Sequence, residues 1–271
     1  MLNLILPLAL ALAGGVGGFF LRRWELASAF DANGLPAPHS APTLLLIALC
    51  LVLTAVFAVL LRRPKYRPAD YNEAFSAKNN WLWLIGMALS AAAILFAGVT
   101  GLRYDGYCSL LCKLTNFLCL LSFVCIPATA WANFQGKPLR FSLTLLVPGY
   151  TLCLWLVSAY QQRAADPVVL DYVYEMLAII CTLLGLYYSA GYSFARPKFR
   201  RCALFGLLGL FFTLVTLADP HSTADRLMLL FMLLYQLSHL TALLYHGFVA
   251  CSSTPAPSPE TNDIQEVTPD E

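Results

Sequence analysis

The residues best suited to chemistry in this chain lie on one long apolar segment near its carboxyl end, 227–250. His239 is close to the middle of that segment, Gln236 precedes it by three residues and His246 follows it by seven. These spacings place all three on one face of a helix. A neutral imidazole can accept a proton or a hydrogen bond, so we expect a ligand-binding stripe facing the bundle interior. The alternative is an interhelical hydrogen bond from His239 to a Tyr or Ser, worth ~1 kcal/mol.

A second candidate lies in the apolar segment 141–160. Pro148 and Gly149 stand near its middle and Tyr150 follows them. Proline removes a helical hydrogen bond, so a kink is expected there, and carriers often bind substrates where a helix is broken at mid-membrane. We therefore expect Tyr150 to bind ligand and to share a cavity with His239. Membrane helices also tolerate proline without any function.

A third polar group is expected at one end of the helices, on the presumed outer face. The group comprises Lys113, Asp166, Asp171, Glu175, Asp219, His221, Asp225 and Arg226, and Lys113, Asp171 and Glu175 are its candidate binding residues. Asp171 and Glu175 are four residues apart, so on one helix they would share a side and could bind a cation, bind a basic ligand or pair with Lys113. The alternative is that acidic residues here simply mark helix starts, as Asp166-Pro167 and the capping-box pattern Ser222–Asp225 do.

Several kinds of chemistry lack their sequence patterns. The chain has no H-E-x-x-H, no G-x-S-x-G, no phosphate-binding G-x-x-x-x-G-K-[ST] and no Cys/His cluster with zinc spacing. No other apolar segment holds a histidine that could complete an axial haem pair with His239. We therefore expect no cofactor and no metal, and we expect neither an intramembrane metalloprotease nor an ATP-driven motor.

The elements that must position these residues are membrane-spanning helices. Hydrophobic residues make up 59% of the 271 and charged residues only 12%, against roughly 25% in soluble domains. About 20 apolar residues are needed to cross the hydrocarbon layer as a helix, and continuous rather than alternating runs exclude a β-barrel. The expected fold is an all-α integral membrane protein, a polytopic bundle of eight transmembrane helices with short loops, near 2–21, 43–61, 81–102, 114–132, 141–160, 176–195, 202–218 and 227–250.

Outside these runs, which carry no Asp, Glu, Lys or Arg, little chain is left for a soluble domain. Residues 1–250 are expected to form a single transmembrane domain. The basic segment 62–80 is expected to lie against lipid headgroups. Residues 251–271, rich in Ser, Thr, Pro and acidic side chains, are expected to be a disordered acidic tail in the cytoplasm.

The distribution of Lys and Arg predicts the orientation, because these residues concentrate in cytoplasmic loops. Eleven lie in the connections after the second, fourth and sixth runs, and six lie on the other side. Both termini are therefore expected in the cytoplasm, with the protein in the cell membrane. Arg22 and Arg23 conflict with this; an inverted first segment followed by a re-entrant one, or a cleaved signal peptide at 1–13, would resolve the conflict.

Three functional classes fit these observations. The first is a small-solute permease or solute-binding membrane component, and the alternative is a non-transporting membrane sensor, scaffold or subunit of a larger membrane complex. The third is a membrane-embedded enzyme that uses the outer-face acidic residues or the histidines. The expected partners are the lipid bilayer, a small-molecule ligand, and a membrane protein partner or a second copy of the chain through glycines such as Gly14 and Gly18. Nucleic acid is not expected, since the basic residues lie between apolar runs as membrane topology requires.

Overall fold

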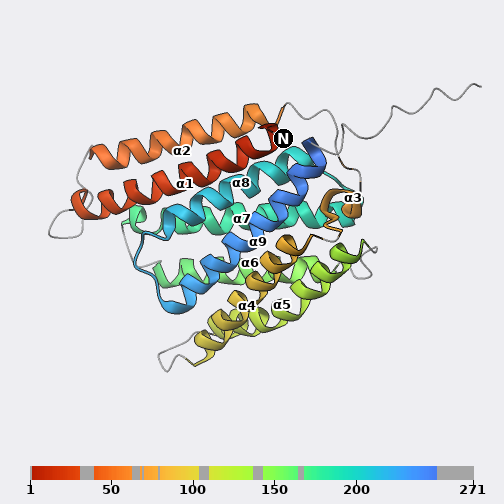
Figure 1. The fold of residues 1–271 in the computed structure, drawn as a ribbon. Coiled ribbons are helices and arrows are strands. Elements are labelled where there is room, and N and C mark those ends of the chain that lie inside the picture. The colour runs from red at the N-terminus through yellow and green to blue at the C-terminus, as the bar shows by residue number, and fades with distance from the viewer. Residues whose placement is uncertain are drawn as a thin grey trace, which may run out of the picture.

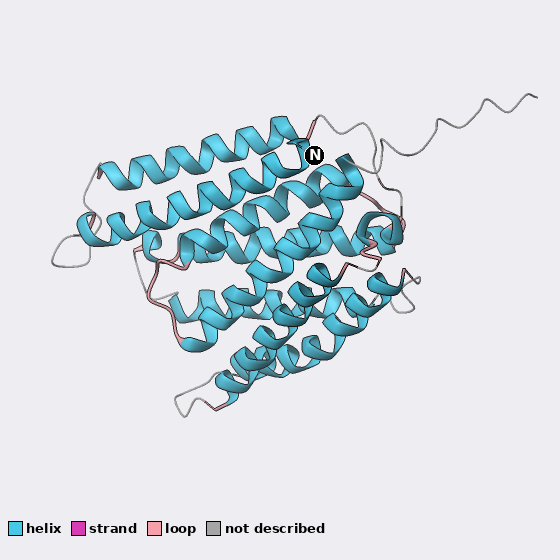
Figure 2. Ribbon diagram, viewed as in Figure 1, coloured by secondary structure: helices cyan, strands magenta, loops and turns pink. Residues whose placement is uncertain are grey.

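The fold is an all-helical bundle whose long helices alternate in direction. The computed structural model describes residues 2–30, 40–62, 68, 70–78, 80–103, 110–136, 143–163 and 168–248, and every regular element in these ranges is helical (Figure 2). The expected tail at 251–271 lies outside the described residues. The elements are α1 (Leu2–Ser28), α2 (Ala41–Leu60), α3 (Tyr71–Phe75), α4 (Trp81–Leu102), α5 (Leu110–Gln135), α6 (Leu143–Arg163), the 3-10 turn η1 (Val169–Asp171), α7 (Val173–Ser193), α8 (Phe199–Thr216) and α9 (Thr223–Phe248).

Three helices form the centre and the others surround them. α8 packs against α7 and α9, the α1–α2 hairpin packs on α8, α4 packs on α9, and α5 and α6 complete the bundle (Figure 1). Thirteen of the 18 residues of α8 are buried, whereas α2 buries four of its 20. The inner helices are therefore covered by protein, and the outer ones turn large apolar side chains outward.

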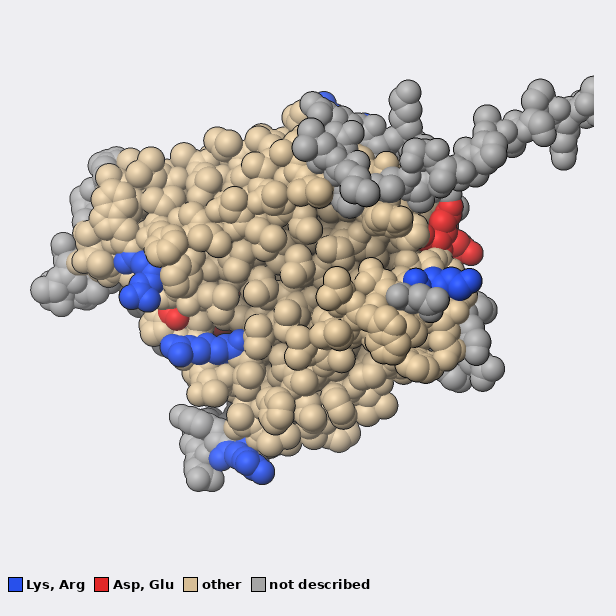
Figure 3. Space-filling model, in the orientation of Figure 1, with Lys and Arg blue, Asp and Glu red and all other residues tan. Residues whose placement is uncertain are grey.

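Eight of the helices are long and apolar enough to cross a membrane. On the face drawn in Figure 3, Lys, Arg, Asp and Glu lie at the two ends of the bundle and a wide uncharged belt separates them. Such a belt needs acyl chains rather than water as its solvent, and helices satisfy their own backbone groups there. The chain is thus a polytopic membrane protein, as its composition predicts. We call the end where α1 begins and α9 finishes the terminal end, and the other the opposite end.

The helix boundaries differ from the predicted runs most at α1. The predicted run stops at Leu21, but α1 continues to Ser28 and carries Arg22 and Glu25 within the spanning helix. The prediction that no span holds a charged side chain therefore fails for α1, because Arg22 and Glu25 pair one turn apart and do not end the helix. α2 is a continuous helix and is not re-entrant.

Small residues of α1 allow its neighbours to approach closely. A Cβ added to Gly14 would lie 2.5 Å from Leu53 of α2, and one added to Gly15 would lie 2.5 Å from Leu214 of α8. These glycines therefore serve close packing inside the bundle. α6 continues unbroken past Pro148.

The short helix α3 enters the bundle instead of lying wholly on the membrane surface. Tyr71, Ala74 and Phe75 are buried, and the Phe75 ring packs on Tyr192 of α7 and His239 of α9. Burial raises the pKa of the Tyr71 phenol, whose oxygen accepts a hydrogen bond of 3.1 Å from Asn133 Nδ2. The headgroup-facing position predicted for 62–80 thus does not hold for residues 71–75, and residues 63–67 lie outside the described ranges.

Candidate functional site

His239 lies in the packed core near the middle of α9. Its side chain stacks on Tyr235 with ring centroids 4.1 Å apart, and it also contacts Phe75 and Trp83. Neither ring nitrogen makes a hydrogen bond to the described residues. The cavity beside His239 holds about 10 Å³, close to the least that admits one water molecule. The interhelical hydrogen bond expected for His239 is therefore not formed, and the space beside it is too small for a solute.

Gln236 lines the same small cavity but is engaged with the neighbouring helices. Its Nε2 donates to the Thr182 carbonyl of α7 at 3.2 Å. A Cβ added to Gly185 would lie 2.7 Å from that Nε2, and one added to Gly206 would lie 3.5 Å from the amide oxygen. Gln236 therefore occupies a slot that two glycines open between α7 and α8.

Tyr150 is not brought to this cavity. Its side chain is 56% exposed on the outside of α6, which packs against α5 and α7. The structure consequently does not bring Tyr150 and His239 into one cavity, although the sequence places both near the middle of apolar runs.

The predicted outer-face group is also divided. Glu175 is buried in the first turn of α7 and pairs with Arg163 of α6 at 2.9 Å, not with Lys113. Asp171 belongs to the separate turn η1, so the two acidic residues do not share one helix. Lys113 is exposed on α5 and forms no ion pair with a carboxylate of the described ranges. The Ser222–Asp225 capping box is formed at the start of α9.

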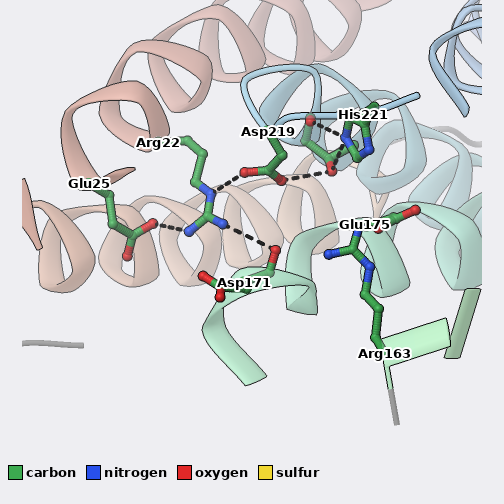
Figure 4. A network of polar contacts seen from close by, with 8 residues as sticks. Arg22, Glu25, Arg163, Asp171, Glu175, Asp219 and His221 are labelled. Carbon is green, nitrogen blue, oxygen red and sulfur yellow. Dashed lines mark hydrogen bonds and ion pairs between the residues drawn. The ribbon is translucent and has the colours of Figure 1, made fainter. Parts of the chain in front are cut away.

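The densest polar site is centred on Arg22 at the opposite end, and it includes Asp171, Asp219 and His221 of the predicted outer-face group (Figure 4). The guanidinium is fully buried; its Nε donates to Asp219 Oδ1 and its Nη1 to Glu25 Oε2, each at 2.7 Å. Nη2 reaches the Asp171 carbonyl at 3.4 Å, and the group lies 5.0 Å from the Tyr174 ring centroid. Arg22 thus connects α1 with η1, α7 and the α8–α9 connection.

Further hydrogen bonds extend this Arg22 network around Asp219. Thr216 Oγ1 donates to Asp219 Oδ2 at 3.1 Å, and His221 Nε2 lies 2.7 Å from the Thr216 carbonyl (Figure 4). One guanidinium faces two carboxylates, and Glu25 Oε1 is buried without a hydrogen-bond partner in the described chain. Such a group fixes geometry strongly, because separating its members would leave charges unpaired at low dielectric.

Sequence reasoning placed Asp171, Asp219 and His221 at one face but missed Arg22 and Glu25, because it divided the chain at charged residues. The sequence did hold a signal: Arg22 and Glu25 directly follow a charge-free run and are spaced to share one helix face. Asp219 directly follows another such run, which places it at the same membrane depth. Of the two arginines that conflict with the predicted orientation, the network pairs Arg22 with two carboxylates, whereas Arg23 is exposed and forms no ion pair among the described residues.

A cleft of about 700 Å³ lies near the terminal end of the bundle. Two helix faces form its walls, one from α1 and one from α9, with Trp83 of α4 between them. The polar part is contributed by the segment before α4, and His246, whose Nε2 lies 2.8 Å from the Ser76 carbonyl, stands beside it. The lining consists of Ile5, Leu8, Ala9, Leu12, Ser76, Ala77, Lys78, Asn80, Trp83, Thr241, Ala242, Tyr245 and His246.

The described residues contain no group of three His, Cys, Asp or Glu side chains placed to hold a metal ion. Comparison with protein-family models, with curated protein sequences and with solved structures found no match for this chain.

Proposed function

We propose that this chain is a solute-binding component of the membrane that takes a small amphiphile into the lateral cleft between α1, α4 and α9. The single observation that carries the proposal is the cleft itself: about 700 Å³, largely apolar, with its polar side chains gathered near one end. Ligand sites usually have this size and this mixture of apolar walls and few polar groups.

The depth of the cleft supports an amphiphile. Its α1 wall runs from Ile5 to Leu12, and the seven steps between these residues, at a rise of ~1.5 Å each, extend about 10 Å. This is roughly a third of a ~30 Å hydrocarbon layer. A ligand would therefore place its apolar part beside α1 and its polar part near Lys78 and His246.

A permease with a central pathway is the less favoured form of this proposal. The space beside His239 holds only about 10 Å³, and α8 is mostly buried at the centre of the bundle. That filled core favours the second candidate, a non-transporting sensor or subunit. Such a protein would detect an amphiphile of the membrane by binding it in the same cleft.

Binding is tested with 11-(dansylamino)undecanoic acid and the purified full-length chain in detergent micelles. Ala9→Phe narrows the cleft, and Ala27→Phe makes the same change on an exposed position near the other end of α1. We expect at least a tenfold loss of probe affinity for A9F and none for A27F, with equal unfolding free energies. Equal affinities would refute the cleft as the binding site. Faster transfer of the probe between leaflets of proteoliposomes than of protein-free vesicles would support the permease.

Orientation belongs to the same proposal, which puts the terminal end in the cytoplasm on the charge distribution given above. Protease added to intact spheroplasts expressing the chain should spare the tail at 251–271, and protease added to inverted vesicles should remove it. Cleavage of the tail in intact spheroplasts would show that the terminal end faces outward and would refute the proposed orientation.

A further inference from the structure

We infer that the amphiphile held in this cleft is an anionic phospholipid from the leaflet at the terminal end; this inference rests on the proposed function. Among the described residues that line the cleft, Lys78 carries a positive charge and none carries a carboxylate. The polar end of the cleft is therefore complementary to a phosphate and not to a cation.

Two further features favour a negative headgroup at this position. α4 begins at Trp81, beside Lys78 and Asn80, so the positive end of a 22-residue helix lies at the polar end of the cleft. Asn80 caps that helix by accepting a 3.2 Å hydrogen bond from the Trp83 amide, which fixes the helix start against the cleft.

His246 adds a third polar contact on the α9 side. Its Nε2 is 2.8 Å from the Ser76 carbonyl and donates to it, which orients the ring at the cleft wall. A protonated imidazole would add a second positive charge, and a neutral one would still offer Nδ1 to a headgroup hydroxyl.

The apolar walls select a lipid over a free anion. Ile5, Leu8 and Leu12 of α1 and Ala242 of α9 offer no hydrogen-bond donor to a phosphate, and they lie at the depth where acyl chains run. Ile5 is 56% exposed and Ala9 is exposed on α1, so a lipid can reach the cleft from the outside of the bundle without leaving the bilayer. A charged headgroup beside one Lys gains about fivefold in affinity, from ~1 kcal/mol per basic residue near an anionic surface.

The test uses nanodiscs of equal parts 1-palmitoyl-2-oleoyl phosphatidylglycerol and phosphatidylcholine. The full-length chain is extracted into mild detergent, and the retained lipid is identified by native mass spectrometry. We expect retained phosphatidylglycerol, about fivefold less of it for Lys78→Gln, and no change for Lys198→Gln, an exposed lysine at the same end outside the cleft. Glycerol 3-phosphate, which has the charge without the chains, should displace nothing.

The other outcomes are separable. If both lipids are retained equally and Ala9→Phe releases both, the cleft binds amphiphiles but the anionic preference is refuted. If Ala9→Phe releases neither, the cleft proposal fails together with this inference. Equal losses for Lys78→Gln and Lys198→Gln, or displacement by glycerol 3-phosphate, would overturn the assignment of the headgroup to Lys78. If phosphatidylglycerol is retained only after residues 251–271 are removed, the chain's own acidic tail occupies the cleft, and the inference of a bound phospholipid is overturned.

Discussion

Removing the guanidinium of Arg22 should destabilise the bundle more than any other single charge change at the opposite end. Arg22→Met deletes two hydrogen bonds of 2.7 Å to carboxylates, each worth about 1.5–3 kcal/mol. It also leaves Glu25 and Asp219 unpaired, with side chains 0% and 4% exposed. Breaking a buried ion pair from one side costs about 3–5 kcal/mol, and we expect a loss of that size.

The measurement is the free energy of unfolding in mixed micelles of dodecyl maltoside and SDS, followed by far-ultraviolet circular dichroism. Arg23→Met is the matched control, because Arg23 is the exposed neighbour on the same helix and should change stability within about 0.5 kcal/mol. The decisive variant combines Arg22→Met with Glu25→Gln and Asp219→Asn. Since the cost comes from unpaired charges, this variant should recover most of the loss; a loss below about 1 kcal/mol for Arg22→Met, or no recovery, would refute the reasoning.

The remaining predictions concern the core. Gly185→Val should lower the free energy of unfolding by about 1–3 kcal/mol, because even its Cβ would meet Gln236 at 2.7 Å, whereas Gly17→Val, with nothing within 4 Å, should lower it less. His239→Leu should not lower the free energy of unfolding, because the ring nitrogens of His239 make no hydrogen bond in the described chain. It should also leave probe affinity unchanged, because His239 does not line the cleft. A loss of probe binding would show instead that the ligand site lies at mid-membrane around His239. Tyr71→Phe should cost about 1 kcal/mol through the lost bond to Asn133, and an unchanged unfolding midpoint would contradict that contact.

The fold followed from sequence because lipid solvation imposes a strong, local constraint. A run such as 81–102 must be helical in the bilayer whatever surrounds it, and α4 has those bounds. The boundaries failed where a charge finds a partner in space, as Arg22 does with Asp219, 197 residues away. No local window contains that partner.

The candidate site was less predictable. Residue spacing shows which side chains share a helix face, but it does not show which face is buried in the bundle. His239 and Gln236 share a face and both are buried. Tyr150 lies just as centrally in its run, but its side of α6 faces outward, and the pairing of α6 with α5 and α7 decided this. The cleft was beyond sequence reasoning for a similar reason, since it arises where α1 and α4 do not close on each other.

The two halves of α1 show how the bundle can be both fixed and adaptable. At the opposite end Arg22 is bound to Asp219 and Glu25, and Gly14 and Gly15 bring the helix close to α2 and α8. At the terminal end, the Ile5–Leu12 face of α1 lines a cleft, and Pro7 removes one backbone donor from its first turns. Buried charge therefore fixes one end of the helix whose other end forms a wall of the cleft. Since these contacts join α1 to η1, α7 and the α8–α9 connection, they hold in place the wall against which the proposed ligand would pack.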